Sequence, residues 1–254
     1  MPLHRELRAQ GDWLFRRRSF LPLGLLVVGL LAFFYAFRQN PQIAAYSSGW
    51  PNLAWFAVGL LGLAVRIYAV GYAAPHTSGR NTSGGQIANY INQTGAYSVW
   101  RHPLYVGNFF MWLAAAGFTH NYWFVLAFVF LYALYYERII YAEEAYLLEH
   151  YGEAYATWAS RTPVVFPKPR NWTPPERSFD WRRVVKREKS GIANLATVAF
   201  GFHALSAYWG GFGVLAQARW WFYLFVAAWT WLLIVKLVQK NTDVLKERAV
   251  QGAV

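Results

Sequence analysis

The stretch LYVGNFFMWLAAAGFTHNYWFVLAFVFLYALYY, residues 104–136, contains no charged residue over its 33 positions. Its main interruption is the polar triplet Thr119–Asn121. A bilayer core of about 30 Å needs roughly 20 apolar residues per helix, so the stretch exceeds one span and allows two short ones. It therefore predicts a membrane-embedded helical hairpin that turns at Thr119–Asn121.

The composition of the whole chain supports a membrane protein. Charged residues make up 14% of its 254 residues, against about 25% in a typical soluble domain. The 14 tryptophans and 17 tyrosines suit the two membrane–water interfaces. The chain has no cysteine, which excludes disulfides, thiolate nucleophiles and cysteine-based metal sites.

Further apolar stretches flank the hairpin on both sides. Together with the hairpin they predict an all-α, polytopic membrane protein with about six transmembrane helices. The first of them is followed by no A-x-A cleavage site, so we expect a retained helix and not a signal peptide. The flanking stretches are Ser19–Phe37, Leu53–Tyr72, Gly191–Ala218 and Trp220–Val235.

The basic residues are distributed unevenly between alternate loops. Of the 24 lysines and arginines, only Arg38 and Arg219 fall in the three loops on one side of the predicted topology. The positive-inside rule then places both termini in the cytoplasm, and we expect a multi-pass protein of a bacterial inner membrane. The net charge of +12 is explained by this topology and by attraction to anionic lipid, so nucleic acid is not an expected partner.

The chain divides by composition into three parts. Residues 1–72 hold a basic arm and the first two membrane helices. Residues 73–170 hold the hairpin and most of the polar side chains that could take part in binding or catalysis. Residues 171–254 hold a basic amphipathic linker (DWRRVVKREKSG, expected on the cytoplasmic leaflet), two further membrane helices and a tail.

Arg101, His102 and Pro103 stand directly before the hairpin. Proline is favoured in the first turn of a helix, so His102 is expected near the N-cap, beside free backbone N–H groups and the positive end of the helix dipole. With the guanidinium of Arg101 this makes an anion clamp for a carboxylate or phosphate. The alternative is a membrane anchor (Arg101) next to an interfacial cap (His102).

The second half of the hairpin continues as a helical pattern beyond the lipid and reaches Glu143 and Glu144, with Gly152 expected to end or bend it. A carboxylate there would hold an ammonium group or a cationic substrate. The alternative is an ordinary surface pair with Arg138. An anion clamp combined with a carboxylate would suit a zwitterionic, cationic cofactor.

Two motifs carry a resemblance to a known family. GAYSVWRHPLYVGNFFMWLAAAG (95–117) and EEAYLLEHYGEAYATWASRTPVVFP (143–167) resemble the integral-membrane methyltransferases related to isoprenylcysteine carboxyl methyltransferase and the phospholipid methyltransferases. The two motifs occur in the family's order and are separated by the uncharged hairpin. The resemblance covers residues 89–167.

The resemblance implies S-adenosyl-L-methionine as cofactor. It implies a lipophilic methyl acceptor: an isoprenylcysteine-type carboxylate, a lipid amine or a small thiol. The catalytic candidates are Arg101, Glu144 and Arg138. Arg101 is the cation of the clamp, and Glu144 or His102 is an available base for an amine acceptor. Arg138 is considered because the family holds the acceptor with an arginine, although that position corresponds to Ile139 here and Arg138 comes one residue early. The implied cofactor-binding residues are Asn89, Tyr97, His102, Pro103, Leu104, Tyr105 and Glu143.

The sequence also departs from the family, because 87 residues follow Pro167. The two extra helices are expected to form an entry path for the acceptor or a contact in a homodimer. Two other functions stay open: a membrane reductase with a nicotinamide cofactor, although no G-x-G-x-x-G is present, and a non-enzymatic membrane binding protein. A metal hydrolase is disfavoured, since no H-E-x-x-H occurs.

Overall fold

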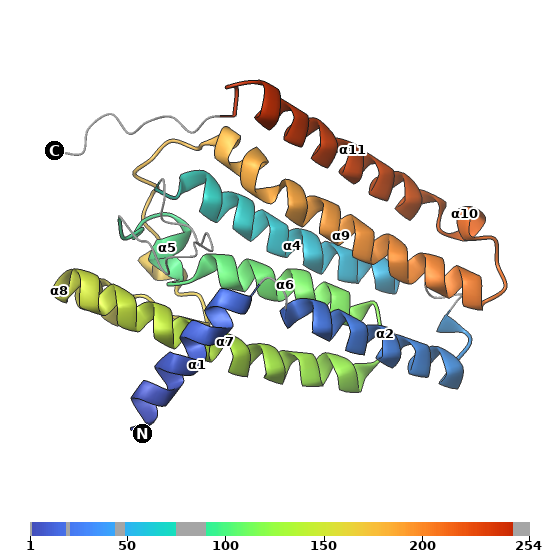
Figure 1. The fold of residues 1–254 in the computed structure, drawn as a ribbon, viewed down its shortest axis with the longest axis horizontal. Coiled ribbons are helices and arrows are strands. Elements are labelled where there is room, and N and C mark those ends of the chain that lie inside the picture. The colour runs from blue at the N-terminus through green and yellow to red at the C-terminus, as the bar shows by residue number, and fades with distance from the viewer. Residues whose placement is uncertain (1, 19–20, 44–48, 75–89, 246–254) are drawn as a thin grey trace.

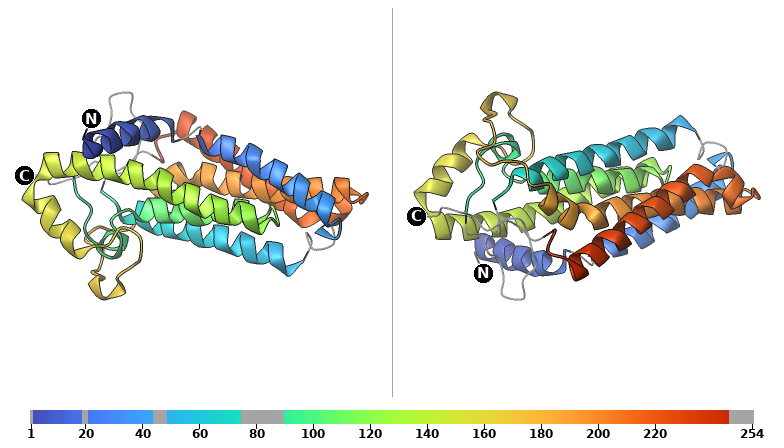
Figure 2. Two further views of the ribbon diagram at one scale, coloured as in Figure 1. Left: turned by 90° about the horizontal axis from the view of Figure 1, so that it is seen from below. Right: turned by 90° about the horizontal axis from the view of Figure 1, so that it is seen from above.

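The computed structural model describes residues 2–18, 21–43, 49–74 and 90–245. Within these ranges the chain folds into ten α-helices and one short 3-10 helix. Six long helices run side by side as an elongated bundle (Figures 1 and 2), which confirms the all-α class. They are α2 (Leu21–Gln39), α4 (Trp50–Tyr72), α6 (Pro103–Gly117), α7 (Tyr122–Tyr151), α9 (Trp181–Trp209) and α11 (Arg219–Asn241).

The shorter elements gather at the two ends of the bundle. One end carries α1, α5 and α8 (Figure 1). The opposite end carries α10. The short elements are α1 (Leu3–Arg17), α5 (Ala96–Val99), α8 (Glu153–Arg161), η1 (Pro169–Asn171) and α10 (Val214–Gln217).

Among the described residues, three helices are long and apolar enough to cross a membrane by length and composition: α4, α7 and α11. The apolar part of α2, Leu23–Gln39, is shorter. Helix α6 has 15 residues, and α9 begins with charged turns. The structure thus has the helices of an integral membrane protein, and the number of six spans stays a prediction.

The hairpin at the centre of the sequence forms as predicted. Helix α6 ends at Gly117 and α7 begins at Tyr122. The side chain of Asn121 caps α7 by accepting a hydrogen bond from the backbone N–H of Phe124 at 3.0 Å, which satisfies one of the free donors of the first turn. The polar triplet that interrupts the apolar stretch therefore supplies the turn and its cap.

Helix α6 is held against α4 by two glycines. A Cβ on Gly107 would lie 2.7 Å from the carbonyl oxygen of Gly62 and 2.5 Å from Cγ of Arg66. Only residues without a side chain allow two helix backbones to come this close. Gly107, four residues after Pro103, therefore sets how closely the start of α6 packs against α4.

The basic linker differs from its expected form. Residues 181–190 are the first turns of α9 and not a separate surface helix. Arg183 and Glu188 in this segment are buried, and Arg183 donates a hydrogen bond to the carbonyl oxygen of Ala73 at the end of α4. The segment was expected on the lipid surface because its charges dominate the pattern, whereas tertiary partners on α4 bury two of them.

Candidate active site

His102 is the N-cap residue of α6 and Pro103 its first helical residue, as expected from the sequence. The fixed backbone angle of Pro103 starts the helix, and Pro103 itself is fully buried. The segment before α6 is tied down by a hydrogen bond from the backbone N–H of Arg101 to the carbonyl oxygen of Pro163, 2.9 Å long. The imidazole of His102 is buried, with 8% of its surface exposed.

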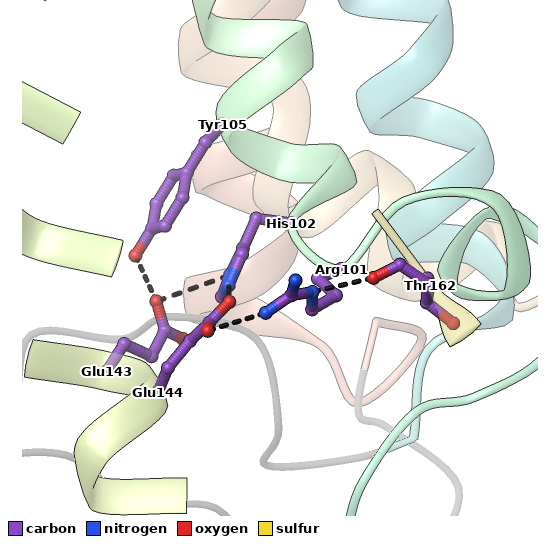
Figure 3. Close-up of polar contacts among 6 residues, drawn as sticks. All are labelled: Arg101, His102, Tyr105, Glu143, Glu144 and Thr162. Atoms are coloured by element: carbon purple, nitrogen blue, oxygen red, sulfur yellow. Dashed lines mark hydrogen bonds and ion pairs between the residues drawn. The ribbon is translucent and has the colours of Figure 1, made fainter. Parts of the chain in front are cut away.

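Glu144 joins the two halves of the predicted motif (Figure 3). One carboxylate oxygen accepts a hydrogen bond of 2.6 Å from Nη1 of Arg101, and the other lies 3.0 Å from Nε2 of His102. The Nε of Arg101 donates to the carbonyl oxygen of Thr162 at 2.6 Å. Glu144 therefore locks the arginine and the histidine onto α7, while Thr162 fixes the guanidinium from the other side.

Glu143 lies on the other side of the imidazole (Figure 3). It accepts a hydrogen bond of 2.6 Å from the hydroxyl of Tyr105, and one of its oxygens is 3.7 Å from Nδ1 of His102. The rings of His102 and Tyr105 stack with centroids 5.5 Å apart. Each imidazole nitrogen thus faces one carboxylate, and the two motifs form a single cluster in space.

Helix α8 supplies an aromatic wall beside this cluster. Tyr155 and Trp158 are buried there with Ile91, and Tyr97 packs against them. Burial, followed by the negative charge of Glu144, raises the pKa of Tyr155 well above its usual value. Burial and then the charge of Glu143 do the same to the pKa of Tyr97. Both phenols therefore remain neutral donors at physiological pH.

The hydroxyl of Tyr155 and Nε1 of Trp158 are buried and make no hydrogen bond to any described residue. The Tyr155 hydroxyl lies near the guanidinium of Arg101 without the geometry of a hydrogen bond. Buried polar atoms normally have partners, so two such donors on one wall mark a place where a ligand's acceptor atoms can bind.

A second polar network lies one helical turn deeper in the bundle. Arg66 on α4 binds Glu188 on α9 through two hydrogen bonds, Nε to Oε2 at 2.8 Å and Nη2 to Oε1 at 2.7 Å. Its Nη1 donates to the side-chain oxygen of Asn108 on α6 at 2.6 Å. The Asn108 amide in turn lies 3.4 Å from the hydroxyl of Tyr136, whose ring is 4.8 Å from that of Tyr105.

Residues 53–154 of the chain match a family model described as phospholipid methyltransferase. The match spans 102 of the 254 residues, so the similarity to this family is one of this segment. The match covers α4, the hairpin and both glutamates of the cluster. The resemblance predicted from the two motifs is therefore confirmed over this segment.

The chain is also similar to two curated proteins. The nickel-cobalt-cadmium resistance protein NccN of Alcaligenes xylosoxydans xylosoxydans is 30% identical over 119 residues, which are 47% of this chain and 53% of that protein. The cobalt-zinc-cadmium resistance protein CzcN of Cupriavidus metallidurans is 29% identical over 119 residues, 47% and 52% of the two chains. The chain spans about half the length of the curated relatives it matches. No solved structure matches the chain.

The matched segment, residues 53–154, brings most of the predicted site residues together. Arg101, His102, Tyr105, Glu143 and Glu144 form the cluster directly. Pro103 and Leu104 form the first turn of α6 beneath it, and Tyr97 stands in the wall beside it. Asn89, the remaining predicted cofactor residue, lies outside the described residues.

Arg138 points elsewhere. Its guanidinium pairs with Glu137 and donates to the carbonyl oxygen of Leu134 at 3.2 Å, and its side chain lines a groove between helices. Ile139, at the family's arginine position, is fully buried. A shift of one residue turns a helical side chain by about 100°, which explains the different direction.

Several residues of the site were not singled out from the sequence. Tyr155 is a position of the family pattern to which no role was assigned, and Trp158 has the pattern of an ordinary helix position. Glu188 is the one acidic residue within residues 181–190, and Arg66 is the one charge in its apolar stretch. An ionisable residue inside an apolar stretch indicates a polar partner, and this was the signal that could have paired them.

Proposed function

We propose that the protein is an integral-membrane S-adenosylmethionine-dependent methyltransferase that acts on a lipophilic acceptor. The observation that carries the proposal is the convergence of Arg101, His102 and Tyr105 with Glu143 and Glu144 at one end of the bundle (Figure 3). The match of residues 53–154 to a methyltransferase family model supports the same reaction class. The acceptor class stays as broad as the sequence left it: an isoprenylcysteine-type carboxylate, a lipid amine or a small thiol.

The chemistry of the donor set fits the proposed cofactor. The cluster contains a guanidinium and an imidazole as well as two carboxylates, which together suit the carboxylate and the ammonium of an amino acid. The unpartnered donors of Tyr155 and Trp158 suit the acceptor atoms of a nucleoside. When bound, S-adenosylmethionine supplies a methyl group on a sulfonium, whose sulfur keeps the electron pair of the broken carbon–sulfur bond.

The protein's own residues would then bind and orient the cofactor and the acceptor and keep water out of the site. Arg101 and His102 at the N-terminus of α6 hold a carboxylate, and Glu143 holds an ammonium or a ribose hydroxyl. Tyr97 and Tyr105 offer ring faces to the positive charge. A displacement of this kind needs the acceptor and the methyl group held in line about 3–3.5 Å apart. An amine acceptor also loses a proton, and His102 or Glu144 would accept it.

The proposed orientation places the cluster at the cytoplasmic membrane surface. Six spans with both termini in the cytoplasm put α1, α5 and α8 on the side rich in lysine and arginine. A water-soluble cofactor would enter there from the cytosol, and a lipophilic acceptor would enter from the bilayer. Reaction of single cysteines introduced at Arg5 and at Arg219 with a membrane-impermeant thiol reagent tests this orientation, and equal labelling of both in intact cells contradicts it.

Calorimetric titration of S-adenosylhomocysteine into the purified protein tests the cofactor assignment. We expect His102→Ala and Glu143→Ala to lose at least tenfold in affinity, since each removes about 1.5–3 kcal/mol of hydrogen bonding to a charged group. Glu137→Ala is the matched control, because it removes an exposed carboxylate from the same helix. Unchanged affinity in the first two variants refutes the assignment.

The relatives' names provide a physiological setting. NccN and CzcN are named for resistance to nickel, cobalt, zinc and cadmium. Among the described residues, no group of three histidine, cysteine, aspartate or glutamate side chains is placed to hold a metal ion. A strain lacking the protein can be compared with wild type for metal tolerance and for lipids that differ by the mass of one methylene unit.

A further inference from the structure

A groove of about 410 Å³ opens on the side of the bundle between α2, α6 and α7. Its volume lies within the range of roughly 300–1,000 Å³ that is usual for small-molecule sites. Most of its wall is apolar, formed by Leu25 of α2, Trp112 of α6 and the α7 residues Phe128, Leu131 and Leu134. The groove lies outside the hydrogen-bonded cluster described above, and the proposed cofactor chemistry does not use it.

One end of this groove is polar. Tyr132, Tyr135, Tyr136 and Arg138 line it there. The hydroxyl of Tyr135 is buried and makes no hydrogen bond to any described residue. Arg18, at the end of α1, lies close enough for its charge to act on the hydroxyls of Tyr135 and Tyr136. The polar end thus offers a donor without a partner in a field of positive charge.

The polar end also adjoins the cluster. The ring of Tyr136 is 4.8 Å from that of Tyr105, which binds Glu143. The ring of Tyr132 stacks on Tyr136 at 4.2 Å, and its hydroxyl donates to the backbone carbonyl of Tyr105 at 2.7 Å. A molecule in the groove would therefore have its head beside the proposed site of methyl transfer and its tail toward the bilayer core.

We propose that the groove binds an amphiphile with one apolar chain and an anionic oxygen head group. The chain would pack along Leu25, Trp112 and Phe128, and the head would accept hydrogen bonds from Tyr135 and Arg138. The carboxylate that binds Arg138, Glu137, has a side chain 68% exposed, and an exposed pair of this kind is weak. The charge at this end selects an acid over an amine.

This inference rests on the proposed function for the occupant's role as methyl acceptor, whereas binding in the groove can be measured alone. The probe is a long-chain fatty acid that carries a photoreactive diazirine at its chain end. It is added to the full-length protein in nanodiscs and irradiated, and the modified residues are mapped by mass spectrometry. We expect labels on Leu25, Trp112 and Phe128, removed by excess oleate at a concentration about tenfold below that needed of oleylamine.

Matched variants separate the groove from the general lipid surface. Leu131→Trp fills the groove and should abolish the labels, while Leu126→Trp adds the same ring to an exposed position of α7 outside the groove and should keep them. In Tyr135→Phe and in Arg138→Gln, the concentrations of oleate and of oleylamine that remove the labels should lie within about twofold of each other. Unchanged melting temperatures show that the four variants fold.

Two results would overturn the inference. Labels as heavy on Leu224 and Leu233, exposed residues of α11, as on the groove would show adventitious lipid only. Equal competition by oleate and oleylamine in the wild type would show that the groove does not prefer an anionic head group. Titration of S-adenosylhomocysteine into the same samples tests the proposed function separately, because cofactor binding can fail while groove labelling persists, and the reverse.

Discussion

The buried ion pair between Arg66 and Glu188 allows a quantitative test of how the last helices are attached. Glu188 on α9 has a side chain only 1% exposed, and its partner on α4 is 20% exposed. Replacing Glu188 with alanine would leave the part-buried guanidinium with Asn108 as its remaining hydrogen-bond partner among the described residues. Removing one member of a buried pair costs about 3–5 kcal/mol, because the other charge is left without compensation.

This free energy corresponds to a large shift in thermal unfolding. For a chain of this size each 1 kcal/mol lowers the melting temperature by about 2–4 °C, so Glu188→Ala should lower it by about 6–20 °C. The assay is thermal unfolding in detergent, followed by intrinsic tryptophan fluorescence. The double variant Arg66→Met/Glu188→Leu should recover most of the loss, since well-packed apolar residues replace buried ion pairs at little cost.

The control is Glu149→Ala, which removes a carboxylate from an exposed pair with Arg8. We expect no resolvable change, because surface pairs contribute little. A melting temperature of Glu188→Ala equal to that of this control would refute the reasoning. A double variant that is less stable than Glu188→Ala would show that the pair, and not only the uncompensated charge, holds α9 in place.

Three further predictions follow from single contacts. Gly107→Ala should destabilise the fold by about 1–3 kcal/mol, because its Cβ would meet the Gly62 carbonyl oxygen and Arg66, while Gly24→Ala, with open space around it, should not; equal melting temperatures contradict this. Glu144→Gln should weaken S-adenosylhomocysteine binding about tenfold or more by releasing Arg101 and His102, and calorimetry that gives the wild-type Kd argues against it. Burial raises the pKa of Tyr155, so above about pH 10 only the unfolded state ionises and stability falls; Tyr155→Phe should lose less stability between pH 9 and about pH 11 than wild type, and identical pH profiles would count against the burial.

The hairpin and its turn were predictable because a long apolar stretch has few ways to satisfy the hydrogen bonds of its backbone in a membrane. Without water, each N–H and C=O must bond within a helix, and Thr119–Asn121 is the place where polar side chains can do so instead. The start of α6 was predictable for a similar local reason, since Pro103 fits the first turn. These features depend on neighbouring residues alone.

The partners within the site depend on contacts between distant segments. The sequence placed Arg101 and His102 opposite the two glutamates only through the family pattern. It did not show that Glu144 binds both of them while Tyr105 binds Glu143. The burial of Glu188 was also missed. Its neighbours are basic and suggest a surface helix, and the deciding fact is a guanidinium on α4, 122 positions earlier in the chain.

The contacts of α9 connect the C-terminal part of the chain to the segment that matches the family model, residues 53–154. Glu188 compensates Arg66, Arg66 orients Asn108, and Asn108 contacts Tyr136 beside Tyr105. The same helix start holds the end of α4 through Arg183 and Ala73. A charge inside the segment thus depends on a residue outside it, so α9 forms part of the scaffold that positions the cluster.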